Sequence, residues 1–356
     1  MTPAGSEFVL ALKMSGYTDS AVRKMLGAAG SPAEAWNNRL ALGRSLKLAA
    51  AVSEVNPDSA LQTLAFKQMQ FRTLLDPDYP TLLKQLPDPP LVLFFTGLLP
   101  AEDEFTLAVV GTRSPTAYGK SATRAFAKAL AKAGCAIVSG FARGIDYEAH
   151  AGALEVGGRT VAVLGSGLDV LYPPEHKTLF RKITESGCVM TEFPPGTQPD
   201  RFNFPARNRV ISGLSRGVFV VEAPEKSGAL ITAHIALDQN REVFALPGPI
   251  HSKASRGANL LIQQGGAKLV MCPADILQEF GIEAPASQTA EQNIELSEDE
   301  ALILKQLGDR QVHIEDLAER LHRPTGWVLS QLTLMEMKGL IRKEPGMYYV
   351  RSVQVN

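Results

Sequence analysis

Glycine-rich turns that carry Arg, Asn or Lys are the parts of this chain best suited to chemistry. The turn Gly111-Thr112-Arg113, the run 139–144 (Ser-Gly-Phe-Ala-Arg-Gly) and the run 224–228 (Pro-Glu-Lys-Ser-Gly) each follow a short apolar segment. Glycine lets a backbone approach a ligand closely, and the free N–H groups at the start of a helix attract anions. Arg and Lys beside such turns therefore indicate a ligand rich in phosphate.

Apolar runs and helical segments alternate around these turns. The runs are 107–110, 136–138, 161–164, 218–222 and 243–246, and helices are predicted at 118–132, 145–154, 175–185, 207–214, 229–239 and 258–264. This pattern is typical of a parallel sheet with both faces covered, whose ligands bind at the carboxyl ends of the strands. The fold class predicted for the core is α/β, an extended Rossmann-like doubly wound parallel sheet that holds a polyanion along one edge.

Composition limits the classes of protein that this chain could be. Its 356 residues include 36 basic and 37 acidic ones, so nucleic-acid binding would need a local patch of positive charge. The three cysteines lack CxxC spacing and indicate buried thiols in a reducing compartment. Neither a signal sequence nor a membrane-length apolar segment is found, so we expect a cytoplasmic protein.

The chain divides into four predicted parts. Residues 1–75 form a helical module, 76–282 the core, 283–295 a polar linker, and 296–356 three helices with a hairpin, which is a winged helix. The turn at 15–18 in the first module could hold a DNA phosphate or could simply pack. The third helix of the winged domain carries little positive charge, so it could read DNA, bind a partner or be structural.

Catalytic and cofactor motifs are weak. The turn at 111–115 lacks the G-x-G-x-x-G of a dinucleotide site, and 114–121 differs from a Walker A loop by having Ser114 in place of the first Gly. Asp146 and His150 could form an acid/base pair or half of a metal site, but a polar helix start with a half-buried His explains them as well. We therefore predict no catalytic residues, no metal and no cofactor.

The remaining functional residues are basic and aromatic. They are Arg113, Arg143, Arg201, Arg207, Arg209 and Lys226, with Asn203 and Asn208, around Phe141, Phe202 and Phe204. Arginine forks match phosphates, and aromatic faces let bases stack without sequence preference. This combination favours a groove for single-stranded nucleic acid.

At these residues the chain resembles a known family, the bacterial DNA processing protein A (DprA, also called Smf). The matching stretches are 111–114, 139–146, 164–169 with 172–176, 192–196, 204–213, 227–232 and 246–248. The outer parts resemble the helical SAM-like and winged-helix modules that flank the core in many members. The resemblance implies a homodimer that binds single-stranded DNA, protects incoming DNA in natural transformation and loads the RecA recombinase, without enzymatic activity.

The resemblance also implies which residues act. By position, the DNA pocket would use Arg113, Phe141, Arg143, Asn208, Arg209, Lys226, Ser227 and Gly228. The dimer contact, and with it the RecA surface, would map to Asn259, Leu260, Leu261 and Ile262.

The alternative is a nucleoside monophosphate hydrolase of the Lonely Guy type, which shares a Rossmann-like core. Those enzymes carry a Pro-Gly-Gly-x-Gly-Thr phosphate loop followed by a catalytic Glu, whereas residues 225–232 here are Glu-Lys-Ser-Gly-Ala-Leu-Ile-Thr. The sequence therefore favours the DNA-binding function over the hydrolase.

Overall fold

The computed structural model describes residues 5–49, 53, 55–282, 297–307, 311–337 and 340–351. The chain divides into two compact units, Met1–Pro285 and Ala286–Asn356, and each is described by itself. The linker predicted over 283–295 lies outside the described residues. Among the helices that can be described, none is long and apolar enough to cross a membrane.

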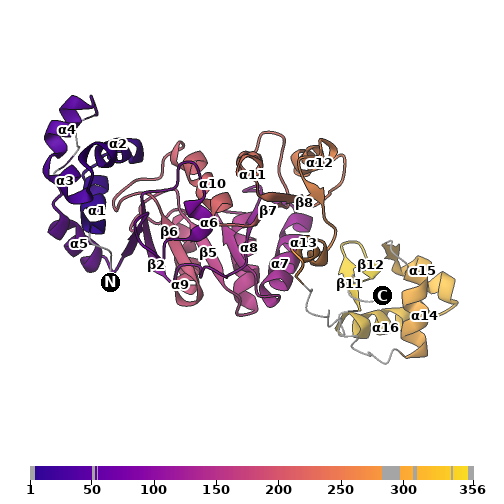
Figure 1. Cartoon of the computed structure of the whole chain (residues 1–356). Helices are drawn as coiled ribbons and strands as arrows, with labels where there is room; N and C mark the ends of the chain where they lie inside the picture. Colours follow the sequence, from indigo (N-terminus) through magenta and orange to yellow (C-terminus); the bar gives the residue numbers. More distant parts are fainter. Residues whose placement is uncertain are drawn as a thin grey trace. The chain divides into compact units, whose positions relative to one another are not determined.

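A nine-stranded sheet forms the centre of the first unit, in the order β1-β2-β6-β5-β4-β3-β7-β8-β9 (Figure 1). Neighbouring strands from β6 to β9 are parallel, and β2 runs antiparallel to both β1 and β6. The strands are β1 (Gln70–Thr73), β2 (Val92–Gly97), β3 (Thr106–Val110), β4 (Ala136–Ser139), β5 (Thr160–Val163), β6 (Cys188–Thr191), β7 (Gly217–Val220), β8 (Glu242–Ala245) and β9 (Lys268–Leu269). The predicted doubly wound parallel sheet is confirmed, and β1, β2, β6 and β9 extend it beyond the predicted apolar runs.

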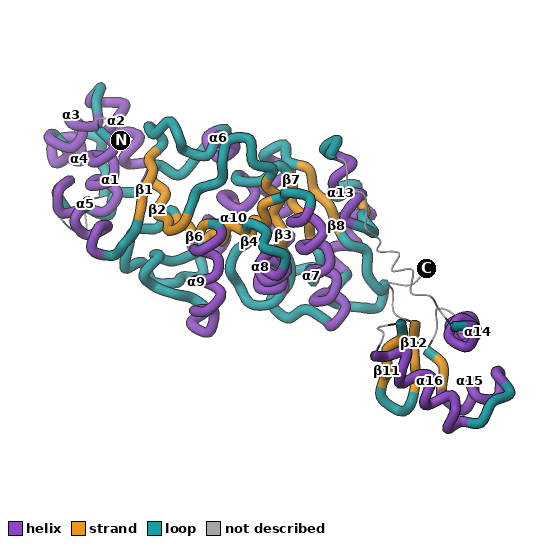
Figure 2. The backbone as a smooth tube through the Cα atoms, turned by 90° about the horizontal axis from the view of Figure 1, so that it is seen from below, coloured by secondary structure: helices purple, strands orange, loops and turns teal. Residues whose placement is uncertain are grey.

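Helices cover both faces of this sheet (Figure 2). Phe126 of α7 stacks on Phe219 of β7 on one face, with ring centroids 4.7 Å apart, while Val210 of α10 packs with the strand valines on the other. The helices are α6 (Thr81–Lys84), α7 (Ala117–Lys132), α8 (Ile145–Glu155), the 3-10 turn η1 (Pro174–His176), α9 (Lys177–Ser186), α10 (Asn203–Gly213), α11 (Gly228–Asp238), α12 (Arg256–Gln263) and α13 (Pro273–Glu279). Because both faces are covered, the central strands β3 to β7 are buried along their whole length and are mainly apolar.

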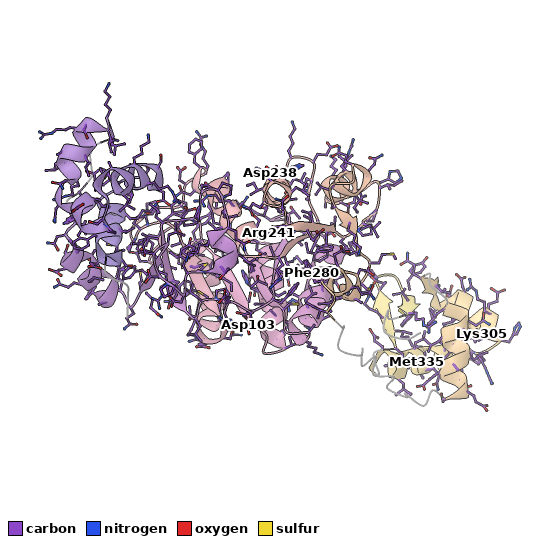
Figure 3. All side chains as sticks on the ribbon, viewed as in Figure 1. Asp103, Asp238, Arg241, Phe280, Lys305 and Met335 are labelled. Atoms are coloured by element: carbon purple, nitrogen blue, oxygen red, sulfur yellow. The ribbon has the colours of Figure 1, made fainter. Side chains whose placement is uncertain are left out.

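Aromatic and cationic side chains hold the last elements of this unit in place (Figure 3). Phe280, which follows α13, packs against Phe105 and Phe244 with centroid distances of 4.9 and 5.9 Å. Arg241, just before β8, donates to the carbonyl oxygen of Leu82 at 3.0 Å and so connects β8 to α6. These contacts connect β8 to α6 and to the segment that follows α13.

The helical module packs on the β1–β2 end of the sheet. Its helices are α1 (Ser6–Met14), α2 (Asp19–Ala29), α3 (Pro32–Asn37), α4 (Arg39–Ser45) and α5 (Pro57–Phe66). Phe71 of β1 and Phe94 of β2 share one apolar cluster with Leu12 of α1. The hydroxyl groups of Ser6 and Thr73 are 2.9 Å apart, and both donate to the carboxylate of Asp76. The sheet therefore begins inside the range predicted for the module, at residue 70.

The second unit is a winged helix. It contains α14 (Glu298–Leu307), β10 (Val312–His313), α15 (Ile314–Leu321), α16 (Thr325–Met337), β11 (Ile341–Glu344) and β12 (Tyr348–Arg351), with the strand order β10-β12-β11. Ile303, Leu317, Leu332 and Tyr349 form its buried core. The capping box predicted at the start of α14 is present, since Ser297 and Glu300 each accept the other's backbone N–H.

Candidate functional site

The strand order reverses between β3 and β7, and a cleft of about 300 Å³ lies at that point. The turn after β3 leads into α7 on one face of the sheet, and the turn after β7 leads into α11 on the other. The cleft is lined by residues of both turns and of α10. Open α/β sheets bind their ligands in the crevice at such a switch point.

Two exposed cations, Arg113 and Lys226, line this cleft from its two turns. The guanidinium of Arg113 lies 5.1 Å from the ring centre of Phe204, and neither cation forms an ion pair with another described residue. Because no carboxylate of the described residues neutralises them, both cations are available to an anionic ligand.

The start of α11 adds backbone donors to the same cleft. Ser227 is the N-cap, and its hydroxyl accepts the N–H of Ala229 at 3.2 Å. Gly228 is exposed, and the space where its Cβ would lie is open. The positive end of the helix dipole and the N–H of Gly228, which has no partner among the described residues, therefore face Lys226 and the cleft.

A buried arginine organises the floor of the cleft. Arg207 of α10 is 4% exposed and donates to the carbonyl oxygens of Gly140 and Val163, at the ends of β4 and β5. Burial lowers the pKa of Arg207 to about 10, and burial raises the pKa of the nearby Asp146. Asn208 donates to the carbonyl oxygen of Gly228 at 3.3 Å, which holds α10 beside the start of α11.

Three of the residues predicted for the DNA pocket do not line this cleft. Phe141 and Arg143 line a smaller adjoining hollow that shares Arg113 and Phe204 with the cleft, and Arg209 lines neither. Phe141 is 1% exposed and packs edge-on against His176, so its ring offers no face to a base. Arg143 is exposed but pairs with Glu175 at 2.5 Å. Arg209 turns away from the cleft and pairs with Glu192 at 2.5 Å. The cleft thus brings together Arg113, Asn208, Lys226, Ser227 and Gly228.

The residues predicted for the dimer contact lie on α12. The side-chain amide of Asn259 is engaged with both backbone groups of Gly248, at 3.1 and 2.9 Å. Leu261 is buried in the core, while Leu260 and Ile262 are half-buried. Only the two half-buried side chains present apolar surface to a partner.

Sequence reasoning missed part of the cleft lining. Thr112 lies between Gly111 and Arg113, and Ile231 and Thr232 lie one turn after Gly228 on α11. Residues three and four apart share a helix face, so the helical period counted from Gly228 would have found the last two.

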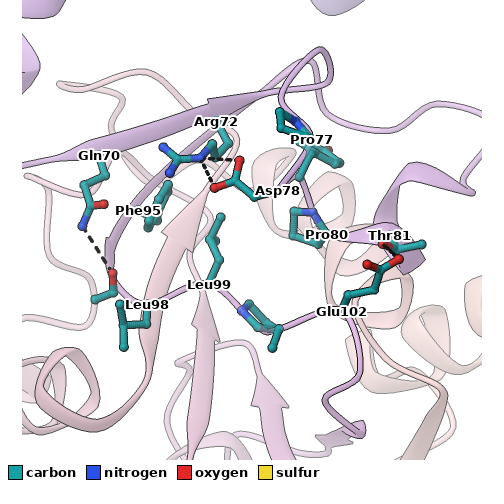
Figure 4. Close-up of a pocket in the computed structure, with 14 residues that line it drawn as sticks. Gln70, Arg72, Pro77, Asp78, Pro80, Thr81, Phe95, Leu98, Leu99 and Glu102 are labelled. Atoms are coloured by element: carbon teal, nitrogen blue, oxygen red, sulfur yellow. Dashed lines mark hydrogen bonds and ion pairs between the residues drawn. The ribbon is translucent and has the colours of Figure 1, made fainter. Parts of the chain in front are cut away.

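A larger hollow of about 510 Å³ lies on the β1–β2 end of the sheet (Figure 4). Its cation is Arg72, which pairs with Asp78 at 2.7 Å, and Gln70 donates to the carbonyl oxygen of Gly97. Because its charge is already neutralised, this hollow lacks the property that would attract a polyanion.

The possible acid/base pair Asp146 and His150 lies inside the protein. His150 is fully buried, its Nδ1 is 2.7 Å from the hydroxyl oxygen of Thr160, and its Nε2 has no partner among the described residues. Burial lowers the pKa of His150 to about 3. Within the described part of the chain, no group of three or more His, Cys, Asp or Glu side chains could hold a metal ion.

Together, the doubly wound sheet, the cationic cleft at its switch point and the winged helix define a class of nucleic-acid-handling protein. Comparison with known families identifies the family within this class. The family described as DNA recombination-mediator protein A matches residues 70–281, and the DprA winged helix domain matches residues 284–347. The chain belongs to the DNA processing protein A (DprA/Smf) family.

Individual relatives agree with this assignment. Protein Smf of Escherichia coli is 44% identical over 280 residues, which are 76% of this chain and 74% of that protein. Protein Smf of Synechocystis is 45% identical over 246 residues, which are 68% of this chain and 62% of that protein.

Two solved structures are also similar. The X-ray structure of DprA from Streptococcus pneumoniae has a TM-score of 0.62 and 36% identity, over 78% of this chain and 99% of that one. The structure of DNA processing protein A from Helicobacter pylori, described for its single-stranded DNA binding mode, has a TM-score of 0.53 and 31% identity, over 59% of this chain and 95% of that one.

We expect His150 to make folding sensitive to acid. Its pKa is about 3 in the folded protein, below the ordinary value of 6.5. The stability that this neutral imidazole contributes is therefore present above pH 6.5 and is lost as pH falls toward 3, by on the order of 5 kcal/mol. His150→Gln should flatten the decrease in unfolding free energy between pH 7 and 4, measured by urea titration. The same substitution at the exposed His251 is the control, and equal pH slopes in the two variants would contradict this role.

Proposed function

We propose that this chain binds single-stranded DNA in the cleft between β3 and β7. The observation that carries the proposal is the pair of exposed cations, Arg113 and Lys226, beside the open N-terminus of α11. Phosphates are strong acceptors for such donors, and the field of the helix adds to the attraction. The binding mode named for the H. pylori relative supports the same ligand class.

In the proposed complex, the charged and the uncharged donors of the cleft have different roles. Arg113 and Lys226 contact phosphates, while Asn208, Ser227 and the Gly228 N–H fix their position. Phe202, which is 69% exposed and lies beside Arg201, offers aromatic surface on which a base stacks. The ring of Phe204 is contacted by the guanidinium groups of Arg113 and Arg207. Phe141 and Arg209 serve as supports for the turns, and Arg143 lies at the margin.

The winged helix is a poor candidate for the main DNA contact. Residues 325–337, which form its third helix, include no Lys or Arg. Duplex binding depends on neutralising phosphates, so a helix without cations gains little from the major groove. This composition favours the core cleft as the nucleic-acid site.

We further propose that the protein acts without turnover. The carboxylate among the described residues that line the cleft, Asp146, is only 7% exposed and lies beside Arg207, and the other polar side chains of the lining are cations, hydroxyls and an amide, which do not supply a general base. The hydrolase alternative needs a catalytic Glu after its phosphate loop, whereas residues 229–232 are Ala-Leu-Ile-Thr. Binding, protection and delivery of the strand fit this set of side chains better than hydrolysis does.

Family membership supports a cellular role for this binding. We propose that the protein acts in the cytoplasm, protects incoming single-stranded DNA in natural transformation and loads RecA onto it. It would do so as a homodimer. Exposed apolar side chains near α12 support such an interface, since Leu237 is 40%, Leu269 42% and Met271 75% exposed.

Loss of either cleft cation should weaken binding to single strands. Arg113→Ala and Lys226→Ala should each reduce affinity for oligo-dT about tenfold and lower the salt slope, d log K/d log[salt], by about 0.7, because each removes one phosphate contact. Fluorescence anisotropy across a salt series measures both quantities. Lys132→Ala, at the opposite end of α7, is the control. An unchanged affinity and slope in both cleft variants would refute the site.

The proposed dimer can be tested on α12. Leu260→Glu places a charge on the half-buried face and should convert dimers to monomers, measured by light scattering after size exclusion. Leu40→Glu on the helical module, where Leu40 is 54% exposed, is the matched control. Dimers that persist in the Leu260 variant would place the interface elsewhere.

RecA loading can be separated from DNA binding. The unmodified chain should shorten the lag of RecA assembly on oligo-dT covered by a single-strand-binding protein, measured by RecA ATP hydrolysis. Lys226→Ala should lose this effect in proportion to its lost affinity. If the unmodified chain binds DNA tightly but leaves the lag unchanged, the loading role is refuted and the binding role stands.

A further inference from the structure

The N-terminus of α7 lies at the same switch point as that of α11. Unlike the start of α11, it is occupied by a carboxylate of the protein itself. The carboxylate belongs to Glu222, which is 1% exposed and follows β7. Its Oε2 accepts the N–H of Thr116 at 2.9 Å, and its Oε1 accepts the hydroxyl of Thr116 at 2.6 Å. Thr116 is the residue that caps α7.

The surroundings are shaped to admit this side chain. A Cβ at Gly119, in the first turn of α7, would lie 2.2 Å from Oε2 of Glu222, so only glycine fits there. The backbone carbonyl oxygen of Glu222 accepts the N–H of Thr112 at 2.7 Å, which fixes the residue against the turn after β3. Glu222 is therefore held to the connection between β3 and α7 twice, by its backbone carbonyl at Thr112 and by its carboxylate at Thr116.

The start of the helix that follows the first strand of a doubly wound sheet is the usual place for a nucleotide phosphate. In this chain it coincides with the segment 114–121, the near match to a Walker A loop. A carboxylate has the charge and the acceptor oxygens that a phosphate would bring. It satisfies the donors of Thr116 and complements the positive end of α7.

We propose that Glu222 is a specificity-determining residue that closes the N-terminus of α7 to phosphate, so that the switch point accepts anions only at α11. The two helix starts then differ in net charge. The one at α7 is neutralised from within, and the one at α11 is strengthened by Lys226. A free nucleotide or inorganic phosphate is excluded from the first position, while a DNA strand can still approach the second.

The test uses inorganic phosphate as the probe and the full chain with Lys226→Ala, which weakens the α11 position. Three proteins are compared: this parent, the parent with Glu222→Ala, and the parent with Glu222→Gln, which keeps the side-chain volume. Phosphate, against chloride at equal ionic strength, should raise the melting temperature of the Glu222→Ala protein by about 3 °C and leave the other two unchanged.

Equal shifts in all three proteins would overturn the proposal. If Glu222→Ala does not fold in chloride, its refolding is measured in phosphate: recovery supports a vacated anion site, and no recovery overturns it. Neither readout involves DNA, so failure here is distinct from failure of the proposed single-strand binding.

Discussion

The reversal of strand order at β3 is the constraint on which the rest of the site depends. Helices that follow β3 and β7 must leave toward opposite faces of the sheet, because each connection packs its helix on the side reached by a right-handed crossover. No helix can cover the point where they diverge. A cleft at the carboxyl ends of the strands is therefore a consequence of the topology, and the side chains of two turns decide what it binds.

Carboxylates and cations around that cleft differ in their exposure to solvent. Asp146 lies close to the buried Arg207, Glu222 caps α7, and Glu192 pairs with Arg209 below the surface. Each of these carboxylates is 7% exposed or less. These three acidic groups thus point inward. The exposed Glu225 beside Lys226 is paired with Arg256, which leaves Arg113 and Lys226 as exposed cations of the cleft. A chain with a net charge near zero can present a positive cleft in this way.

The buried polar groups also connect the cleft to the scaffold. The guanidinium of Arg207 bonds to carbonyl oxygens at the ends of two strands, so the turns after β4 and β5 are held with α10. Burial raises the pKa of Glu192 to about 7, although Arg209 opposes this, because the pair is removed from water between β6 and α10. Such groups must be partnered to be tolerated in the interior, which makes the loops around the cleft stiff.

The order of apolar runs and helical segments by itself determined the doubly wound core and the winged helix. A run such as 218–221 is apolar throughout only when both of its faces are covered, and this is a local property that the sequence displays. The turns after 110 and 222 could be assigned to the ligand edge for the same reason. Arg113 and Lys226 were found because cations beside glycine turns are a local pattern too.

Only the tertiary structure decided which of the basic and aromatic residues face the cleft. Arg207, Asn208 and Arg209 are consecutive, yet one forms the floor, one joins α11 and one pairs with Glu192, because successive residues of a helix point about 100° apart. Phe141 belongs to the same turn as Arg143, but its side chain is buried in the core. The role of Glu222 depends on Thr116 and Gly119, about a hundred residues earlier in the chain, and adjacent strands bring them together. The sequence therefore determined which residues could bind, while the packing of helices on the sheet decided which of them do.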